Sequence, residues 1–161
     1  MRKFEKISYE QFEKDVNMNK KIYDEYKLPK RCTKTSAGYD IFAIENFIIK
    51  PNEIKKIPTG IKVCMNPDEV LFLVVRSSMG FKYNVRMCTQ VGVIDHDYYN
   101  NETNEGHIYI ALQNEGDKDY IVKKGDAYAQ GIFIKYLTVD NEEEIKEERR
   151  SGLGSTSRKK G

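Results

Sequence analysis

VLFLVVRSSMG, residues 70–80, decides how this chain folds. Its first six residues are apolar without a break, which indicates a strand at the centre of the fold or of an oligomer and makes the run a candidate assembly surface. Arg76 and the hydroxyls of Ser77 and Ser78 follow directly. An arginine beside two hydroxyls at a strand end forms a seat for phosphate, and a polar turn with a serine cap is the alternative interpretation.

Short segments rich in Ile, Val, Phe and Tyr recur on both sides of this run. Ile61, Val63 and Met65 alternate with more polar neighbours, as in a strand with one buried face. Gly, Pro and Asn residues at turn positions separate the segments. The spacing predicts an all-β sandwich or barrel. The other predicted strands are FIIK from residue 47, HIYIAL from residue 107, DYIV from residue 119 and GIFIKY from residue 131.

Composition narrows the class of protein. A chain of 161 residues suits one domain with its own hydrophobic core. With 27 basic and 25 acidic side chains the formal charge is +2, which argues against a nucleic-acid partner. Cys32, Cys64 and Cys88 form no C-x-x-C pair and are expected to be reduced thiols. A charged start and no apolar run near ~20 residues predict a cytoplasmic protein without a membrane partner.

Three regions are expected along the chain. Residues 1–27 form an N-terminal appendage, in which Ser8 and Gln11 start a short helix that ends near Val16. Residues 28–139 form the β domain. Residues 140–161 change from acidic to basic composition and are predicted to be a flexible tail.

Three further segments carry chemical groups. The tail sequence RRSGLGSTSR, residues 149–158, combines glycines, hydroxyls and arginines as a polyphosphate clamp would, unless it is simply a disordered end. GDAYAQ, residues 125–130, is a turn that leads into a strand and delivers an amide. In residues 90–107, Asp95 and Asp97 would share one face of an extended strand and serve a metal or act as a base, or belong to an acidic loop. His96 and His107 are expected to be surface or structural residues.

In order along the chain, five segments resemble the five motifs of the trimeric dUTP nucleotidohydrolase family, the dUTPases. The resemblance covers about residue 28 to the end, and it implies a β jelly roll that forms a homotrimer with active sites shared between subunits. It also implies Mg²⁺-assisted hydrolysis of dUTP to dUMP and pyrophosphate, which keeps uracil out of DNA and supplies dUMP for dTMP synthesis. The five segments are TSAGYDIFA (35–43), RSSMG (76–80), GVIDHDY (92–98), GDAYAQ (125–130) and RSGLGSTS (150–157).

The resemblance also assigns roles to residues. Asp95 matches the base that activates water for attack on the α-phosphate, and Tyr98 matches the tyrosine whose ring packs beneath the deoxyribose and excludes a 2′-hydroxyl. Asp40 would lie near Mg²⁺ through water, with the ion mainly on the triphosphate. Backbone groups around Thr89, Gly92 and Ile94 would read uracil. The residues that would bind the rest of the substrate are Arg76, Ser77, Ser78, Gln130, Arg150, Leu153, Gly154, Ser155 and Thr156.

The chain departs from the family pattern in three places. Most members have a phenylalanine that stacks over the base where this chain has Leu153. A Bacillus-type and phage subset also has leucine at this position. Residues 99–105 form an inserted loop after Tyr98. The fifth motif ends in Ser157, where the family usually has glycine. Glycine adopts positive φ freely, and serine does not.

Two other functions remain open. A dCTP deaminase of the same fold would need a glutamate in the strand after the third motif, where this chain has Ala111. A dUTP-sensing regulatory protein would use dUTP to present a surface to a protein partner, with the inserted loop or residues 1–27 as the contact surface. Nucleic-acid binding by the basic tail is the weakest hypothesis.

Overall fold

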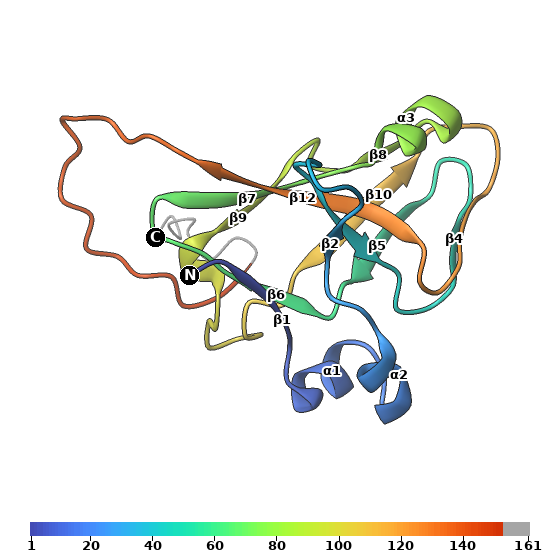
Figure 1. Ribbon diagram of the computed structural model, residues 1–161, viewed down its shortest axis with the longest axis horizontal. Coiled ribbons are helices and arrows are strands. Elements are labelled where there is room, and N and C mark those ends of the chain that lie inside the picture. Colours follow the sequence, from blue (N-terminus) through green and yellow to red (C-terminus); the bar gives the residue numbers. More distant parts are fainter. Residues whose placement is uncertain (153–161) are drawn as a thin grey trace, which may run out of the picture.

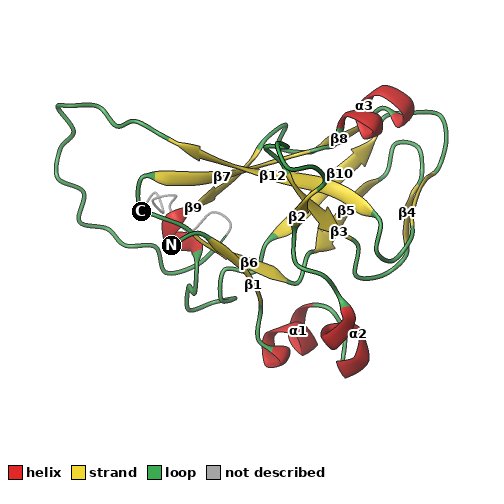
Figure 2. Ribbon diagram, viewed as in Figure 1, coloured by secondary structure: helices red, strands yellow, loops and turns green. Residues whose placement is uncertain are grey.

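The computed structural model describes residues 1–152 and consists mainly of β-strands, which confirms the predicted all-β class (Figure 1). Figure 2 shows the strands through the middle of the molecule and the short helices at its periphery. The elements are β1 (Lys3–Lys6), α1 (Tyr9–Asp15), α2 (Lys20–Glu25), β2 (Lys30–Arg31), β3 (Tyr39–Phe42), β4 (Phe47–Ile49), β5 (Ile54–Pro58), β6 (Ile61–Cys64), β7 (Glu69–Val74), α3 (Ser77–Tyr83), β8 (Val85–Met87), β9 (Gly92–Asp95), a 3-10 turn (His96–Tyr98), β10 (Tyr109–Asn114), β11 (Tyr120–Val122) and β12 (Ala127–Lys135).

The largest sheet has the strand order β2-β3-β12-β7-β9, and its pairs are antiparallel. Smaller sheets have the orders β5-β10-β8, β11-β4 and β1-β6. The core between the sheets is aliphatic. Its fully buried side chains include Ile41, Ile49, Ile61, Leu71, Leu73, Ile108, Ile110 and Leu112.

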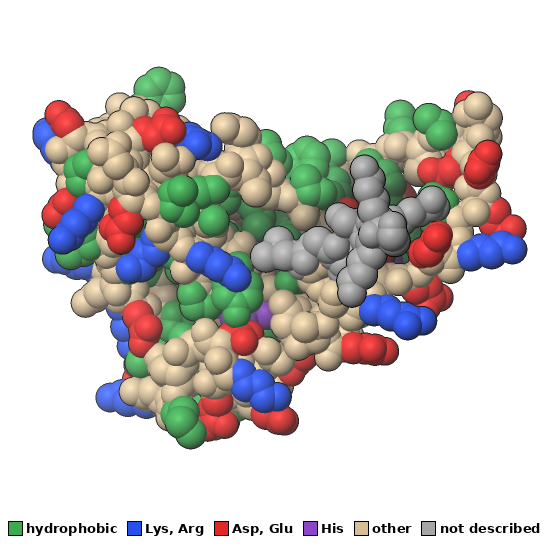
Figure 3. Space-filling view, turned by 180° about the vertical axis from the view of Figure 1, so that it is seen from behind, with side chains coloured by type: hydrophobic (Ala, Val, Ile, Leu, Met, Phe, Trp, Pro, Cys, Tyr) green, Lys and Arg blue, Asp and Glu red, His purple; other side chains and the backbone are tan. Residues whose placement is uncertain are grey.

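The two faces of strand β7 are covered to different extents within this chain. Leu71 and Leu73 are buried in the core, whereas Phe72 between them is only half-buried. The strand pairs place Ile132 and Val93 on either side of Phe72, so the three form an apolar row across the sheet. Figure 3 shows hydrophobic side chains exposed over the middle of the molecule. The sequence indicated a strand at the centre of the fold or of an oligomer, and in a single copy this face of β7 is only partly covered by the described residues.

The N-terminal segment shares the core of the β domain. Strand β1 pairs with β6, and the side chains of Ile7 and Phe12 are fully buried. The Ser8 hydroxyl accepts a hydrogen bond from the Gln11 amide at 3.1 Å, which confirms the predicted helix start. Helix α2 was not predicted. The division of the chain at residue 28 stays a prediction about domains, but the segment before it is packed against the rest.

After β12 the chain leaves the sheet as an extended arm and turns back toward the end of β9 (Figure 1). The cysteines Cys32, Cys64 and Cys88 are free thiols, as predicted. Within residues 1–152, no helix has the length and apolar character needed to cross a membrane.

Candidate functional site

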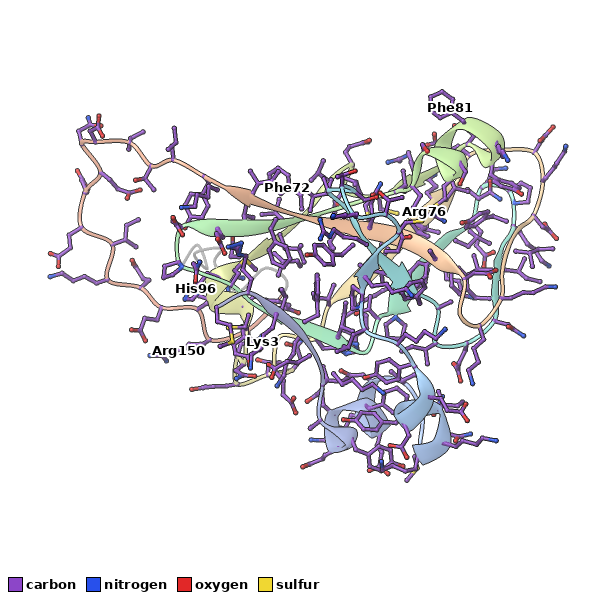
Figure 4. All side chains as sticks on the ribbon, viewed as in Figure 1. Lys3, Phe72, Arg76, Phe81, His96 and Arg150 are labelled. Atoms are coloured by element: carbon purple, nitrogen blue, oxygen red, sulfur yellow. The ribbon has the colours of Figure 1, made fainter. Side chains whose placement is uncertain are left out.

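Asp40, Arg76 and Gln130 come together across three neighbouring strands, in β3, just after β7 and in β12, and we call them the phosphate cluster. The Arg76 Nε lies 3.2 Å from the Asp40 Oδ1. Strand pairing places Gln130 of β12 directly opposite Asp40 of β3 and Val74 of β7. Figure 4 shows Arg76 at this end of the sheet. The first, second and fourth motif segments therefore meet in one chain.

Local packing fixes the amide of Gln130. A Cβ at position 38 would lie 2.0 Å from the Gln130 Oε1, so only glycine lets this side chain lie against β3. The Gln130 Nε2 donates to the Val75 carbonyl at 3.2 Å. Ser77 and Ser78 open α3 beside Arg76, and both are exposed. A guanidinium, an amide and two hydroxyls can together bind and neutralise phosphate oxygens.

Asp95, Asp97 and Tyr98 form a second group, the carboxylate corner, at the other end of β7. Strand β9 ends at Asp95, and the 3-10 turn carries the chain around to Tyr98. The expected common strand face is therefore wrong, because the strand stops between the two aspartates. One guanidinium nevertheless joins them. The Arg149 Nη2 lies 2.6 Å from the Asp95 Oδ2, and its Nε lies 2.7 Å from the Asp97 Oδ1.

The Tyr98 hydroxyl is held from two sides. It donates to the His107 carbonyl at 2.7 Å and accepts from the Asn104 Nδ2 at 2.9 Å. Burial raises the pKa of Tyr98, so the hydroxyl remains a donor across the physiological range. The arm lies against the ring, since a Cβ at Gly152 would be 3.3 Å from the Tyr98 Cε2.

The two histidines are structural and surface residues, as predicted. His107 is buried, and its Nε2 accepts from the Gly60 amide at 2.9 Å. Its Nδ1 lies 2.6 Å from an Asp15 oxygen, and because Nε2 is an acceptor, Nδ1 is the donor to that carboxylate. Burial lowers the pKa of His107, which is therefore neutral. His96 is exposed, and its Nδ1 lies 2.7 Å from the Met65 carbonyl.

The residues expected to read uracil lie along β9 and the turn before it. Thr89 is in that turn, and Gly92 and Ile94 are in the strand. A Cβ at Gly92 would lie 2.9 Å from the Leu73 Cβ, so glycine allows β9 to pack closely on β7. Strand β9 is outermost in its sheet, and no described strand pairs with its other edge. Backbone donors and acceptors on that edge are available to a ligand.

The phosphate cluster and the carboxylate corner lie far apart in a single copy. Asp95 pairs with Val70 at the start of β7, whereas Arg76 follows the end of that strand. Val70, which is opposite Asp95, and Arg76 are six residues apart along extended chain, which corresponds to about 20 Å. One chain thus carries both groups without bringing them into a common site.

A metal ion would find few protein ligands here. In the part of the chain that the structure describes, no three His, Cys, Asp or Glu side chains form a group that could hold a metal ion. Asp40 is the one carboxylate in the phosphate cluster, and its side chain is 13% exposed. This arrangement fits an ion that keeps waters and phosphate oxygens as its main ligands.

Some predicted residues lie at or beyond the end of the described chain. Arg150 is exposed, and its carbonyl is 3.5 Å from the Thr103 hydroxyl. Leu153, Gly154, Ser155 and Thr156 lie outside the described residues. Sequence reasoning missed Asn104 and the double contact of Arg149. The only signal for Asn104 was the run of asparagines in the inserted loop.

Comparisons with known proteins find similarity to dUTPases along most of the chain. Residues 24–158 match the family model described as dUTPase. A deoxyuridine 5′-triphosphate nucleotidohydrolase of Lactococcus lactis is 47% identical over 130 residues, which cover 80% of this chain and 87% of that protein. One of Haemophilus influenzae is 32% identical over 126 residues, covering 76% and 80%.

Solved structures agree with the sequence matches. The crystal structure of dUTPase from Streptococcus mutans has a TM-score of 0.69 at 37% identity, and the match covers 86% of this chain and 98% of that one. A dUTPase from phage phi11 of Staphylococcus aureus has a TM-score of 0.66 at 21% identity, covering 91% and 97%, and supports the fold alone. The placement within a Bacillus-type and phage subset stays a prediction. The chain belongs to the dUTPase family.

Proposed function

We propose that this enzyme hydrolyses dUTP to dUMP and pyrophosphate in a site that one copy cannot complete alone. The observation that carries the proposal is the separation of the carboxylate corner from the phosphate cluster along β7. A base must lie within hydrogen-bond reach of the water it activates, and that water must lie next to the reacting phosphorus. A second copy that brings its phosphate cluster to the first copy's carboxylate corner supplies that geometry.

Asp95 is the proposed base. Its carboxylate takes a proton from a water molecule, whose oxygen then bonds to the α-phosphorus. The bond from that phosphorus to the oxygen bridging the α- and β-phosphates breaks, and pyrophosphate leaves. A positioned base supplies ~10²- to 10⁴-fold in rate. Because Arg149 contacts Asp95 in the substrate-free chain, the tail must release this carboxylate before it can act.

The phosphate cluster neutralises the charge that the reaction moves. Arg76 and Gln130 contact phosphate oxygens in this proposal, and Ser77 and Ser78 add hydroxyl donors. Mg²⁺, when bound, would neutralise triphosphate charge and favour departure of pyrophosphate. Asp40 would hold the ion through a water molecule. Of the tail residues, Arg150, Leu153, Gly154, Ser155 and Thr156 would close over the substrate.

Selectivity for deoxyribose is assigned to the ring of Tyr98. The ring would pack against the sugar face at C2′, where a 2′-hydroxyl has no room. The hydroxyl contacts to His107 and Asn104 support this role, because they hold the ring in place. Backbone groups of β9 and of the turn at Thr89 would select uracil.

A homotrimer is the assembly we propose. The apolar row of Ile132, Phe72 and Val93 is only partly covered in one copy, with Val93 exposed, and an exposed apolar surface on a sheet favours association. Threefold symmetry gives each copy a neighbour on either side, so each carboxylate corner receives one phosphate cluster.

Pyrophosphate release from dUTP, UTP, dCTP and dTTP with Mg²⁺ tests the activity. Asp95→Asn should lose ~10²- to 10⁴-fold in kcat while still binding dUTP. Asp97→Asn, which alters the other carboxylate on Arg149, should retain most of the rate. The base assignment would be refuted if Asp95→Asn turned dUTP over normally or no longer bound it, or if Asp97→Asn lost as much rate as Asp95→Asn.

Mixed assemblies test the shared site. Asp95→Asn and Arg76→Ala chains are each expected to be inactive alone. When they are unfolded together and refolded at equal amounts, about a quarter of the sites receive an intact Asp95 and an intact Arg76 from different copies. Recovery to about a quarter of wild-type activity supports sharing between copies. No recovery, with mixed trimers verified by mass spectrometry, would place the site within one chain.

Two alternatives give different products or partners. A dCTP deaminase would release ammonia from dCTP, but Ala111 of β10 cannot carry a proton. A regulatory role is the other. Phage dUTPases of similar fold control transfer of virulence genes by a proto-oncogenic G protein-like mechanism. In this chain the inserted loop and the N-terminal segment form one surface, joined at Ser8 and Glu105, on which a regulatory protein would bind.

A further inference from the structure

We propose that Asn104, in the inserted loop after Tyr98, is a positioning residue that sets how strongly this enzyme rejects ribonucleotides. The inference rests on the proposed role of Tyr98 in dUTP hydrolysis and extends it to a residue outside the five motifs. It starts from the bond between the Asn104 Nδ2 and the Tyr98 hydroxyl at 2.9 Å.

The direction of this bond is determined by its surroundings. The Asn104 Oδ1 accepts from the Asn101 Nδ2 at 2.9 Å and from the Gly106 amide at 3.1 Å. Both partners are donors, so the oxygen must face them and the nitrogen must face Tyr98. The Tyr98 hydroxyl has a single proton, which it gives to the His107 carbonyl. A donor such as Asn104 is therefore the partner that this oxygen requires on its other side.

Asn101 holds Asn104 in place. It is 8% exposed, and its Nδ2 donates both to the Asn104 Oδ1 and to the Tyr98 carbonyl at 2.9 Å. Its Oδ1 accepts from the backbone amides of Thr103 at 3.0 Å and Asn104 at 3.2 Å. A buried amide whose donors and acceptor are all used is costly to displace, so the network is rigid.

Glu105 and Gly106, at the end of the inserted loop, anchor it to the rest of the fold. Glu105 accepts from the Ser8 amide at 3.0 Å and forms an ion pair with Lys62 at 3.2 Å. Burial alone would raise the pKa of Glu105, but the Ser8 hydrogen bonds and the Lys62 ammonium outweigh it and lower that pKa. A Cβ at Gly106 would lie 2.5 Å from the Tyr98 carbonyl, so the loop closes directly onto the tyrosine.

The arm meets the ring and hydroxyl of Tyr98 at the same place. A Cβ at Gly152 would lie 3.4 Å from the Tyr98 hydroxyl and 3.7 Å from the Asn104 Nδ2. Asn104 thus lies where the sugar-contacting ring and the start of the fifth motif come together. Discrimination by exclusion depends on the ring staying in position, because a small displacement opens room for a 2′-hydroxyl.

Steady-state kinetics of the full chain with dUTP and UTP test the inference. Asn104→Ala should lower the ratio of kcat/KM for dUTP to that for UTP by about fivefold, the effect of one neutral hydrogen bond. Asn104→Asp keeps the side-chain size but replaces the donor with an acceptor, and it should lower the ratio at least as much. Glu102→Ala, at an exposed position of the same loop, is the matched control and should leave the ratio unchanged.

A double-mutant cycle separates positioning from a general effect on the fold. Tyr98→Phe keeps the ring and removes the hydroxyl, so adding Asn104→Ala to it should change the ratio no further. Melting temperature and oligomer size are measured for every variant, and Asn104→Asp serves if the alanine variant does not fold.

Three outcomes would overturn the inference. A wild type that releases no pyrophosphate from dUTP refutes the proposed function as well. A wild type that cleaves dUTP and UTP alike refutes the role of Tyr98. A selective wild type with an unchanged ratio in the folded Asn104 variants, or with the same loss in the Tyr98→Phe background, refutes only the role of Asn104.

Discussion

The phosphate cluster and the carboxylate corner are built in different ways. Strand pairing positions the first, because Asp40 and Gln130 face each other in adjacent strands and Arg76 directly follows a third. Hydrogen bonds of side chains position the second. The Tyr98 hydroxyl bonds the Asn104 side chain of the inserted loop and the His107 backbone carbonyl, and the Arg149 side chain of the arm contacts Asp95. A site held by backbone register tolerates change around it, whereas one held by side-chain hydrogen bonds depends on each partner.

After Asp95→Asn, the largest effect is expected where a single side chain of the phosphate cluster binds the substrate. Arg76→Lys keeps the charge but loses the bidentate fork, and kcat/KM for dUTP should fall by about 10². Arg86→Lys is the control, because Arg86 pairs with Glu115 away from both groups. Pyrophosphate release measures both variants. Equal losses in the two would mean that the cluster has no special part in binding triphosphate.

The stability of the fold beside the carboxylate corner should depend on pH through the buried side chain of His107. Its folded pKa lies below the ordinary value of 6.5, so the unfolded chain binds the proton first as the pH falls. The free energy of unfolding should therefore decline below about pH 6.5, by up to ~1.4 kcal/mol per pH unit. Urea unfolding between about pH 7 and about pH 5.5 measures the slope. His107→Gln should flatten it, and His96→Gln should not; parallel curves for all three proteins would contradict this.

Arg149 tests whether side-chain contacts hold the arm at the carboxylate corner. Arg149→Gln breaks both ion pairs, so a lysine-specific protease should cut after Lys146 about two- to fivefold faster in the substrate-free protein. High salt should accelerate cleavage of the wild type in the same way. Arg150→Gln leaves these pairs intact and is the control. Identical rates for all proteins would show that the arm is not held there.

The smallest effects are expected at two buried tyrosines, Tyr128 and Tyr26. Tyr128 precedes Gln130 in β12, and its hydroxyl finds no hydrogen-bond partner among the described residues. Tyr128→Phe should raise the free energy of unfolding by ~1 kcal/mol. Tyr26 donates to the Gly60 carbonyl at 2.6 Å, so Tyr26→Phe should lower it by ~1 kcal/mol. Urea unfolding measures both free energies of unfolding. If the two variants changed it in the same direction, the result would contradict the structure.

The sequence predicted the apolar strands well. Segments such as FIIK and IKVCM carry alternation or continuous apolar runs, and they are β4 and β6 in the structure. Strands β1, β2, β3, β5, β8 and β9 were not among the predicted strands. The lysines of IKKIP, the shortness of VRM and the glycine and aspartate of GVID remove the usual pattern, and these strands form because neighbours pair with them.

The candidate site divides in the same way. The resemblance of the motif segments to the dUTPase family identified Asp40, Arg76 and Gln130. The strand pattern supports two of them, because Arg76 follows the predicted strand at 70–75 and Gln130 precedes the one that starts at residue 131. Asn104 carries no such signal, since its role depends on the contacts of its amide in three dimensions. The expected strand face shared by Asp95 and Asp97 failed because the chain turns after Asp95. Periodicity does not predict where a strand stops.

The separation of Asp95 from Arg76 along β7 has a kinetic consequence. If each reaction centre needs groups from more than one copy, turnover is not first order in protein. At concentrations where three copies are mostly apart, the rate rises with the cube of the chain concentration, and it becomes linear once assembly is complete. Dilution then inactivates the enzyme without unfolding any chain, and the amount of protein made becomes a means of control.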